Sequence, residues 1–524
     1  MVALTHLPHR FTGQAPAQPD QRQLVESLCQ PGVLDSGTEP VTLMETHISY
    51  VLLTGEFAYK IKKAVNLQFL DFSTLAARRH DCHEELRLNR TLAPSVYLDV
   101  VAITGTVDAP VIGDDGPVLE YALKMRQFRQ DGLLSDMLAR GVLTDQHIDQ
   151  LAAVLASFHQ NTNRARAEAP YGRLHDVLQP ALENFTQLMA VVAEPRDRSD
   201  LESLRTWTGG EHTICAARFV HRRRHGFVRE CHGDLHLGNI ALIDGRVTLF
   251  DRLEFNPSMR WTDVMNDVAF VVADLQARKR PDLAARFLTG YLEATGDYEG
   301  LGVLRFYVVY RAMVRAKVAW FRLRQLESPD ERTKVHAEYL SFVELARRHT
   351  HRPQAAITIT HGLAGSGKTT CAQRLLERTG AIRIRTDLER KRLHGLEAAA
   401  ASGSNVGEGL YTAESTRHTY SHVCTLARMV VQAGYRVVVD GAFLQRWQRE
   451  MFRETATTLA VPFVIVDVPA SEGTLRERIA RRRQRGADAS EATLDVLDAQ
   501  LRADEPLDVE ERRFVVSCED AGAA

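Results

Sequence analysis

The beginning of the chain alternates apolar and polar positions mostly with the period of β-strands. Residues 41–63 form two such runs joined by a Thr-Gly pair, which predicts a hairpin. Residues 74–93 carry leucines at helical spacing and end before Pro94, which predicts a helix. Two more strand-like runs follow, at 96–104 and 118–128. This part of the chain therefore predicts a small lobe built mainly of strands.

The pattern then becomes mostly helical, over about 132–205 and again over 262–348. A strand, a loop and a second strand separate these two regions, at 227–251. We therefore expect a larger and mainly helical lobe to follow the small one.

A third rhythm begins after the sequence HTHRPQ at 349–354, which interrupts the helical pattern and is the best linker candidate. Residues 355–362 read as a strand, and strand-like runs return at 436–443 and 461–469 with helical stretches between them. Alternation of strands and helices is typical of a parallel α/β sheet. The chain of 524 residues is thus expected to be an α/β multidomain protein.

Composition narrows the class of protein without indicating its chemistry. Apolar residues make up 44% and charged residues 25%, as in ordinary globular proteins, and the formal net charge is −2. Such a balance provides no general positive field for nucleic acid or an anionic membrane. No apolar run approaches the roughly 18 residues that span a bilayer. Met1 to Asp20 is polar and contains three prolines, so we expect neither a signal peptide nor an anchor.

The cysteines suggest a reducing compartment. There are seven, and they are scattered without a C-x-x-C pair. An odd and unpatterned set in a large protein is typical of reduced thiols. We therefore expect reduced cysteines and a cytoplasmic protein, with no structural zinc.

The clearest motif of the second half is GLAGSGKT at 362–369, with a predicted strand before it and a helix after it. In a P-loop the backbone N–H groups surround a phosphate chain, the lysine reaches the β and γ phosphates, and the hydroxyl ligates Mg²⁺. We therefore predict an ATP and Mg²⁺ site, with Thr369 as a metal ligand. Its residues are Gly362, Gly365, Ser366, Gly367, Lys368, Thr369 and Thr370.

Two aspartates follow predicted strands of this half. Asp387 ends a short strand, where a carboxylate can accept the proton of an acceptor hydroxyl, with Arg390 following as a candidate substrate ligand. The alternative for Asp387 is a helix N-cap, and one side chain can do both. Asp440 ends another strand and is placed to hold Mg²⁺, with a simple turn aspartate as the alternative.

Arg478 and Arg482 lie four residues apart and hence on one face of a predicted helix. Arginines of a lid helix stabilise the charge that develops on a transferred phosphoryl group, whereas a solvated helix face is the plainer interpretation. Together with the P-loop, Asp387 and Arg390, they make this half resemble small-molecule P-loop kinases of the gluconate kinase, shikimate kinase and zeta-toxin type. It is also similar to the kinase half of polynucleotide kinases.

The sharpest motif of the first half is HGDLHLGNI at 232–240, followed by a strand that ends at Asp251. The spacing fits a kinase catalytic loop: Asp234 orients and deprotonates an acceptor hydroxyl, while Asn239 and Asp251 bind Mg²⁺. The alternative is a loop fixed by buried polar residues. His236 is a candidate substrate contact or plain loop surface, and His232 is expected to brace the loop.

This loop resembles that of the aminoglycoside phosphotransferase and choline kinase family, over roughly residues 40–275. The resemblance implies a bilobal, protein-kinase-like α+β fold. It implies Lys60 as the strand lysine that meets ATP, with Lys62 as runner-up, and Glu85 or else Glu84 as its partner. It also implies an adenine-binding hinge at 119–128.

Two further aspartates match the family's pair after the metal site. They are Asp263 and Asp267, of which Asp267 is expected to brace the loop. The small lobe lacks G-x-G-x-x-G, and Asp251 is followed by Arg252 instead of glycine. The set of metal ligands is unaffected by either departure.

Arginines on a predicted apolar helix bear on the acceptor of the first half. Arg311 and Arg315 are four residues apart, with Arg322 close to the same face. Buried arginines need anionic partners, which are either structural acids or a phosphate or carboxylate of the substrate. We therefore expect an anionic acceptor and predict that aminoglycosides, which are polycations, are poor substrates.

The sequence as a whole predicts a bifunctional ATP-dependent kinase whose acceptors are small hydroxyl compounds rather than membranes or nucleic acid. The alternatives are a single kinase regulated by a nucleotide-sensing P-loop domain, and a P-loop half that phosphorylates polynucleotide 5′-hydroxyls. The expected domains are an N-terminal extension (1–40, partly helical), a kinase domain (41–350, with lobes 41–128 and 129–350), and a P-loop domain (355–524).

Overall fold

The structure is a computed structural model. It describes residues 19–34, 41–67, 70–113, 115–352, 354–397, 400, 409–485 and 493–521. The chain forms two compact units, each considered by itself below. The first contains Met1–Arg278 and Leu304–Thr350, and the second contains Lys279–Val303 and His351–Ala524. The described helices include none that is both long and apolar enough to cross a bilayer.

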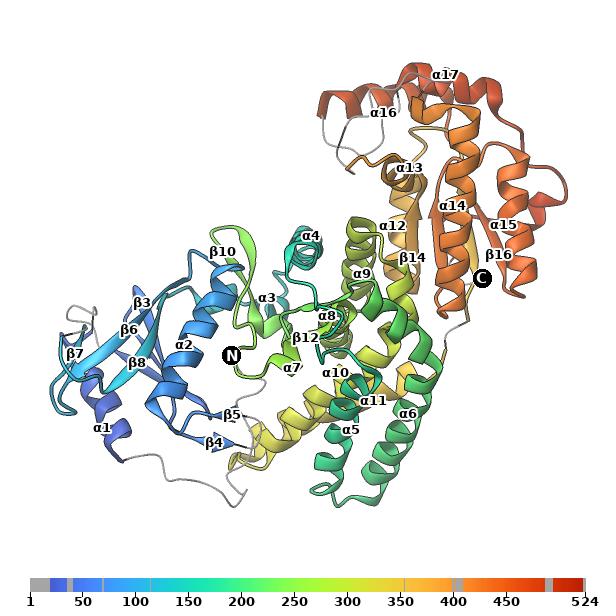
Figure 1. Cartoon of the computed structure of the whole chain (residues 1–524). Coiled ribbons are helices and arrows are strands. Elements are labelled where there is room, and N and C mark those ends of the chain that lie inside the picture. Colours follow the sequence, from blue (N-terminus) through green and yellow to red (C-terminus); the bar gives the residue numbers. More distant parts are fainter. Residues whose placement is uncertain are drawn as a thin grey trace. The chain divides into compact units, whose positions relative to one another are not determined.

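The first unit begins with an antiparallel sheet of six strands in the order β1-β2-β3-β8-β6-β7. The strands are β1 (Thr42–Glu45), β2 (Ser49–Leu53), β3 (Phe57–Lys62), β6 (Tyr97–Gly105), β7 (Pro110–Ile112) and β8 (Glu120–Arg126). Helix α1 (Pro19–Leu28) packs near β7, and α2 (Leu75–Arg90) packs on β6 and β8 (Figure 1). The short strands β4 (Asn66–Leu67) and β5 (Leu70–Asp71) pair with each other.

The predicted helix at 74–93 is confirmed as α2, which Thr74 caps by accepting a hydrogen bond from the Ala77 N–H. The predicted hairpin at 41–63 is confirmed for β2 and β3. However, the first run is not one strand. The Thr46 hydroxyl bonds the Ser49 N–H, and this turn divides the run into β1 and β2.

The large lobe is mainly helical, as predicted. Its helices are α3 (Leu134–Ala139), α4 (Asp145–Asn161), α5 (Leu174–Met189), α6 (Pro195–Arg224), α7 (Pro257–Arg260), α8 (Val264–Ala277), most of α10 (Leu301–Leu323) and α11 (Pro329–Thr350). Short strands carry the catalytic-loop region: β9 (Val228–Glu230), β10 (Ile240–Ile243), β11 (Arg246–Leu249) and β12 (Trp261–Asp263). The core helix α8 is buried over almost its whole length, which fixes the segments that pack on it.

The second unit is built on a parallel sheet of five strands in the order β14-β15-β13-β16-β17. Its strands are β13 (Ile357–His361), β14 (Ile382–Arg385), β15 (Val437–Asp440), β16 (Phe463–Asp467) and β17 (Val515–Val516). Its helices are α12 (Lys368–Thr379), α13 (Thr386–Leu393), α14 (Ala413–Gln432), α15 (Arg446–Thr458), α16 (Glu472–Arg485) and α17 (Leu494–Ala503). The central strands β13 and β15 are buried on both faces, as expected of strands covered by helices on both sides.

The second unit also contains a segment from the middle of the chain. Helix α9 (Pro281–Thr295) packs on α12 and β14. The Glu293 carboxylate binds the Arg383 guanidinium through two contacts of 2.8 and 3.1 Å, and both side chains are largely buried. Tyr298, just after α9, donates a hydrogen bond to Glu389 of α13. Residues far from the P-loop in sequence thus cover the edge strand β14 and pack on α12, the helix that follows the P-loop.

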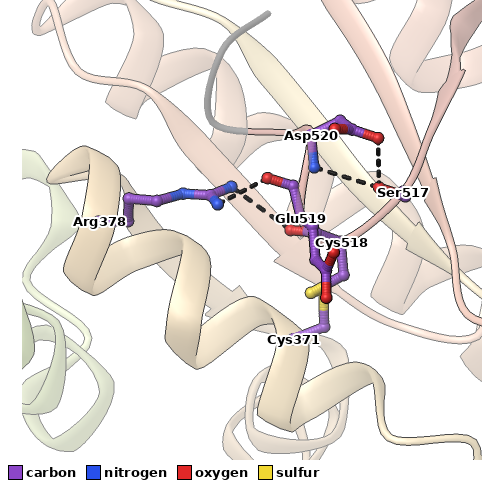
Figure 2. Close-up of a disulfide and its surroundings, with 6 residues drawn as sticks. All are labelled: Cys371, Arg378, Ser517, Cys518, Glu519 and Asp520. Carbon is purple, nitrogen blue, oxygen red and sulfur yellow. Dashed lines mark hydrogen bonds between the residues drawn. A yellow bond between two sulfur atoms is a disulfide. The ribbon is translucent and has the colours of Figure 1, made fainter.

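A disulfide joins Cys371 of α12 to Cys518 near the end of the chain (Figure 2). The expectation of reduced cysteines is therefore wrong for this pair. The sequence could not reveal it, because 147 residues separate the two thiols and only the folded sheet brings them together. Arg378, about two turns further along α12, donates to the backbone oxygens of Cys518 and Glu519 at 3.4 and 2.6 Å.

The disulfide should stabilise the second unit by restricting its unfolded state. A cross-link over a loop of this length contributes about 2–5 kcal/mol. We expect Cys518→Ser to lower the melting temperature of the second unit, and dithiothreitol to have the same effect on the unaltered protein but none on the variant. Calorimetry with and without reductant checks this. Equal melting temperatures in all four samples would show that the bond contributes nothing to stability.

Candidate active sites

In the first unit, an ion-pair triad links the small lobe to the loop after β11. The Lys60 ammonium, on β3, lies 2.7 Å from Oε1 of Glu85 on α2 and 3.0 Å from Oδ1 of Asp251. Glu85 is fully buried. Burial opposes the ammonium charge, but Asp251 and Glu85 outweigh it and raise the pKa of Lys60. The lysine therefore remains charged, as a group that meets phosphates must.

The structure distinguishes the two candidate lysines by their partners. Lys62 shares Glu85 at 2.5 Å, and it also contacts Asp81 at 3.0 Å and Glu254. It is completely buried and does not line the cavity described below, whereas Lys60 does. Glu84 points to a different set of partners, Arg87 and Arg260. Sequence analysis missed Glu254, because no motif marks an acid at that position.

The catalytic loop is held by hydrogen bonds from a buried carboxylate. Asp267 on α8 accepts the backbone N–H of His232 at 2.7 Å and that of Gly233 at 3.0 Å. Its pKa lies at about 2, because bonds from His159 and the loop outweigh the effect of burial. The His232 ring meets the Phe250 carbonyl oxygen at 2.9 Å. Both residues thus occupy the bracing positions that we expected of them.

Two predicted functional side chains of the loop meet each other. Asn239 donates from Nδ2 to the backbone oxygen of Asp234 at 2.9 Å and to its carboxylate at 3.3 Å. Burial opposes ionisation of Asp234. The neighbouring His236 ring and the charges of Arg311 and Arg315 outweigh this and lower the pKa of that carboxyl. Asp234 is therefore ionised and oriented at neutral pH.

His236 lies beside this aspartate. Its Nδ1 accepts the Gly238 N–H at 3.0 Å, so the neutral ring carries its proton on Nε2. Nε2 lies 3.6 Å from Asp234 Oδ2 and has no hydrogen-bond partner although it is buried. Burial lowers the pKa of His236, which keeps the ring neutral. The N–H is thus available to a ligand oxygen.

Asp251 has an unusual backbone conformation, and Arg252 after it is held by its own partners. Its φ of 59° lies in the left-handed region, and its N–H is bonded to the Tyr97 hydroxyl at 3.0 Å. The buried Arg252 side chain donates from Nε to the Cys231 carbonyl oxygen at 3.0 Å, and the Arg252 backbone N–H donates to Asn89 Oδ1 at 2.7 Å. Arg252 therefore fixes the backbone just after β11 by bonds to Asn89 and Cys231. Asp263 is similarly structural and pairs with Arg222.

These groups surround a cavity of about 660 Å³. Its lining includes Lys60 and Asp251, together with Gln127 and Phe128 of the predicted hinge. His236 also lines it, as do Arg126, Arg278, Arg315 and Arg322. Glu45 and Thr46 contribute from the end of β1. Gly55 is close by, with its N–H bonded to the Gln127 side chain at 3.0 Å.

The arginines of α10 have separate roles. Arg311 donates to Asn266 at 2.7 Å and stacks on the Phe270 ring, so it is mainly structural. Arg315 is 7% exposed and reaches Glu338 at 3.2 Å, but its buried Nε and Nη1 have no partner. Arg278 was missed from the sequence. It bonds Asp274, which in turn holds the Leu237 N–H.

In the second unit, the P-loop connects β13 to α12. Gly362 and Gly367 have φ of 138° and 109°, which only glycine adopts readily. A side chain at Gly362 would also meet the Val468 carbonyl oxygen at 2.8 Å. Lys368 and Thr369 begin α12, where the N–H groups of a helix favour an anion. The Ser366 hydroxyl is buried without a partner inside the loop.

The two predicted acids of this unit lie at the ends of adjacent strands, Asp440 as the last residue of β15 and Asp387 in the first turn of α13, just after β14. The N-cap of α13 is Arg385, so the helix N-cap alternative for Asp387 is wrong. Asp387 and Asp440 both line a cavity of about 650 Å³ with Lys368 and Thr369. Thr386 Oγ1 bonds the Asp440 carbonyl oxygen at 3.2 Å, which couples the two strand ends. Burial and the charge of Asp440 raise the pKa of Asp387. A raised pKa suits a general base.

Of the two predicted lid arginines, the structure describes the side chain of Arg478 only. Arg478 of α16 donates to the backbone oxygens of Gly365 and Ser366 at 3.3 and 3.0 Å, so it reaches the P-loop. Arg482 belongs to α16, but its side chain lies outside the described residues.

The remaining wall of the cavity is aromatic and basic. Arg390 of α13 lines it together with Tyr411, Arg417, Tyr420 and Trp447. Of these, sequence analysis identified only Arg390. The others are scattered over helices without a motif, and the fold alone assembles them.

Comparisons with known proteins agree with this description. A family model described as the phosphotransferase enzyme family matches residues 69–307, and one described as an AAA domain matches residues 357–507. The second match contains the P-loop. An uncharacterized protein of Mycobacterium tuberculosis is 30% identical over 454 residues, covering 86% of this chain and 88% of that protein. An uncharacterized protein of Mycobacterium bovis gives the same values.

Solved structures resemble each half. A choline/ethanolamine kinase family protein from Mesorhizobium loti is 12% identical, with a TM-score of 0.37, over 63% of this chain and 99% of that one. A gluconokinase from Sinorhizobium meliloti is 20% identical, with a TM-score of 0.23, over 32% of this chain and 82% of that one. The chain thus has a kinase-like phosphotransferase domain followed by a P-loop α/β domain.

The different partners of the two lysines lead to a prediction. We expect Lys60→Met to reduce phosphotransfer by the first unit roughly 10²-fold or more while largely preserving its melting temperature. Lys62→Met should instead cost about 3–5 kcal/mol of stability, because it leaves Asp81 and Glu254 buried without their ammonium. Steady-state kinetics and thermal unfolding of both variants check this. A stable but inactive Lys62→Met variant would reverse the two assignments.

The raised pKa of Asp387 leads to a second prediction. The base form exists above that pKa, so kcat/KM of the second unit should fall on the acid side with a midpoint above the ordinary aspartate value of about 4. Ionising this carboxyl also opposes folding, since its folded pKa exceeds its unfolded one. Asp387→Asn should therefore raise the melting temperature at pH 7 and change it less at pH 4. A variant that is less stable at pH 7 would contradict the assignment.

Proposed function

The chain belongs to the same family as the uncharacterized mycobacterial protein, and we propose that it is an ATP-dependent phosphotransferase with two active sites. Each unit transfers the γ-phosphoryl group of ATP to the hydroxyl of a small molecule. The observation that carries this proposal is the presence of a complete set of phosphotransfer residues in each unit, around a cavity of its own. The two matched families support phosphotransfer as the type of reaction.

In the first unit, Lys60 binds the phosphates of ATP and Glu85 fixes its position. Asn239 and Asp251 offer the amide and carboxylate oxygens that Mg²⁺ prefers, so the donor set fits this ion. Bound Mg²⁺ neutralises charge on the phosphates. Asp234 orients the acceptor hydroxyl and receives its proton as the oxygen bonds to the γ-phosphorus and ADP departs.

In the second unit, the P-loop backbone and Lys368 hold the phosphates. The Thr369 hydroxyl and the Asp440 carboxylate provide oxygen atoms for Mg²⁺, and these also fit the ion. Asp387 accepts the proton of the hydroxyl. Arg478 contacts the P-loop backbone and is the lid residue that stabilises negative charge on the phosphoryl group.

The acceptor of the first unit is anionic. Arg315 supports this, because it lines the cavity, its buried Nε and Nη1 have no hydrogen-bond partner, and a buried guanidinium needs an anion. His236 adds a neutral N–H donor on the same side. A polycationic aminoglycoside would meet Arg278, Arg315 and Arg322, so drugs of the kanamycin class should be poor substrates.

Two substitutions separate the activities. Asp234→Asn should reduce the rate of transfer by the first unit roughly 10²-fold or more. Lys368→Ala should reduce the rate of transfer by the second unit to a similar extent. Labelled ATP and a pool of small metabolites provide the measurement, with the exposed Asp330→Asn and Lys334→Ala as matched controls.

Two labelled product sets that disappear separately would support the proposal. A second unit that binds ATP, transfers nothing and changes the rate of the first would mean that it is a nucleotide sensor. Labelling of oligonucleotide 5′ ends, lost only with Lys368→Ala, would replace the small acceptor of the second unit by a polynucleotide. No labelled product from any variant would exclude kinase activity.

A further inference from the structure

We propose that Glu293 and Tyr298 are positioning residues for Asp387, the base that the proposed function assigns to the second unit. Both lie in a segment that belongs to this unit although it comes from the middle of the chain, Lys279–Val303. The segment falls inside the residues matched by the phosphotransferase family model and outside the match that contains the P-loop. The inference rests on the proposed function, because it concerns the base of that reaction.

Helix α13, which carries Asp387 in its first turn, needs support from other elements. It has eight residues and follows β14, the edge strand of the parallel sheet. A helix of this length is marginal by itself, so tertiary contacts must fix it. One contact holds its start, since the Thr386 hydroxyl donates to the Asp440 carbonyl oxygen at 3.2 Å.

The side chains of α13 divide into two sets. Asp387 and Arg390 lie three residues apart, and both line the cavity. Glu389 and Arg392 are also three residues apart, so they share a face as well. With about 3.6 residues per turn, the second pair lies on nearly the opposite face from the first. Contacts to Glu389 and Arg392 can therefore set the position of Asp387 without entering the cavity.

Tyr298 and the end of α9 provide these contacts. The Tyr298 hydroxyl donates to Glu389 at 3.4 Å. Arg392 bonds Glu389 as well as the Glu293 carbonyl oxygen. Glu389 is buried, and His422 of α14 lies 3.3 Å from it. Burial opposes ionisation of Glu389, but the bonds from His422 and Arg392 outweigh it and lower its pKa. The carboxylate is therefore a charged anchor that joins α13, α14 and the segment around Tyr298.

Strand β14 is fixed to α9 by a buried ion pair. The Glu293 carboxylate binds the Arg383 guanidinium at 2.8 and 3.1 Å, and Arg383 also donates to Gln373 of α12 at 2.7 Å. Burial opposes the charge of Arg383, but Glu293 outweighs it and raises the pKa of the guanidinium. Since Arg383 precedes Asp387 by four residues, the ion pair fixes the strand end from which α13 begins.

A base must lie close to the hydroxyl whose proton it accepts, so a small displacement of Asp387 is costly. A shift of about 1 Å in a reacting group can lower a rate about 10²-fold. Lys368, which holds the phosphates, begins a different helix, α12. Loss of the Glu293 and Tyr298 contacts should therefore lower the rate of transfer and leave the binding of ATP unchanged.

The full-length chain tests this in an Asp234→Asn parent, in which transfer by the first unit is suppressed. The reaction is transfer from labelled ATP to the pool of small metabolites, and only products that Lys368→Ala removes are counted. Glu293→Gln removes the charge that Arg383 binds, and Tyr298→Phe removes one hydroxyl and keeps the buried ring. Each variant is measured below its melting temperature, so that the folded fraction does not limit the rate.

The double variant Glu293→Gln/Tyr298→Phe should lower the apparent kcat roughly tenfold or more, with KM for ATP close to that of the parent. A loosened α13 also exposes Asp387 to water, which removes the main cause of its raised pKa. The acid-side midpoint of kcat/KM should therefore move down toward about 4. The charged groups that act on this carboxyl are present in every variant, namely Lys368, Arg385, Arg390 and Asp440.

Arg286→Gln is the matched control, because it alters α9 at a contact with another helix. The Arg286 guanidinium lies 2.9 Å from Glu377 of α12. This variant should keep the kcat and the midpoint of the parent. Should the double variant fail to fold, Tyr298→Phe alone should still lower kcat and shift the midpoint, each by less.

A folded double variant with the kcat or the midpoint of the parent would overturn the inference and leave the proposed function intact. A raised KM for ATP, or an equal loss of rate in Arg286→Gln, would also overturn it, because α9 would then act on α12 and not on the base. If the parent makes no product that depends on Lys368, the proposed function of the second unit fails before any variant of α9 is made.

Discussion

The first unit depends on ion pairs that neutralise the charges buried inside its small lobe. Glu85 is fully buried and accepts two ammonium groups, those of Lys60 and Lys62. The buried Glu85 carboxylate is stabilised by two cations, and the buried Lys62 by three acids, because a charge in the interior needs partners of opposite charge. Strand β3, helix α2 and the loop after β11 are therefore held in one arrangement, and the position of Asp251 follows from it.

The need to neutralise buried charge also gives the two lysines different roles. Lys62 is surrounded by acids and keeps the lobe together, so Lys60 can face the cavity with one side occupied by Glu85. Asp267 does the equivalent work for the catalytic loop through its bonds to His232 and Gly233. Lys62 and Asp267, which have several partners each, thus hold the elements that carry the residues of the cavity. Arg315 and the His236 Nε2 are left with unmet hydrogen bonds at the cavity.

In the second unit, backbone N–H groups, and not buried ion pairs, form the binding site for phosphate. Its phosphate site consists of N–H groups at the start of α12. They can converge on a phosphate because the glycines of the P-loop adopt positive φ angles. Around it, long-range contacts fix the helices: Glu293 holds Arg383 on the edge strand, and the disulfide ties α12 to the end of the chain. Arg390 differs from these residues, because its buried Nε has no hydrogen-bond partner although Nη1 has two.

The sequence by itself determined the features that depend on local spacing. These are the P-loop, the catalytic loop, the alternation of strands and helices in the second half, and the identity of Asp234, Asn239 and Asp251 as one set. Local rules suffice here, because a turn or a strand end places neighbouring residues wherever the rest of the chain lies.

Only the tertiary structure decided what depends on distant partners. It gave Lys60 and Lys62 different environments and brought Cys371 to Cys518. It placed α9 beside the P-loop helix and assembled an aromatic wall from residues without a motif. Burial and charge compensation are properties of the packed chain, so no pattern in a single segment can specify them.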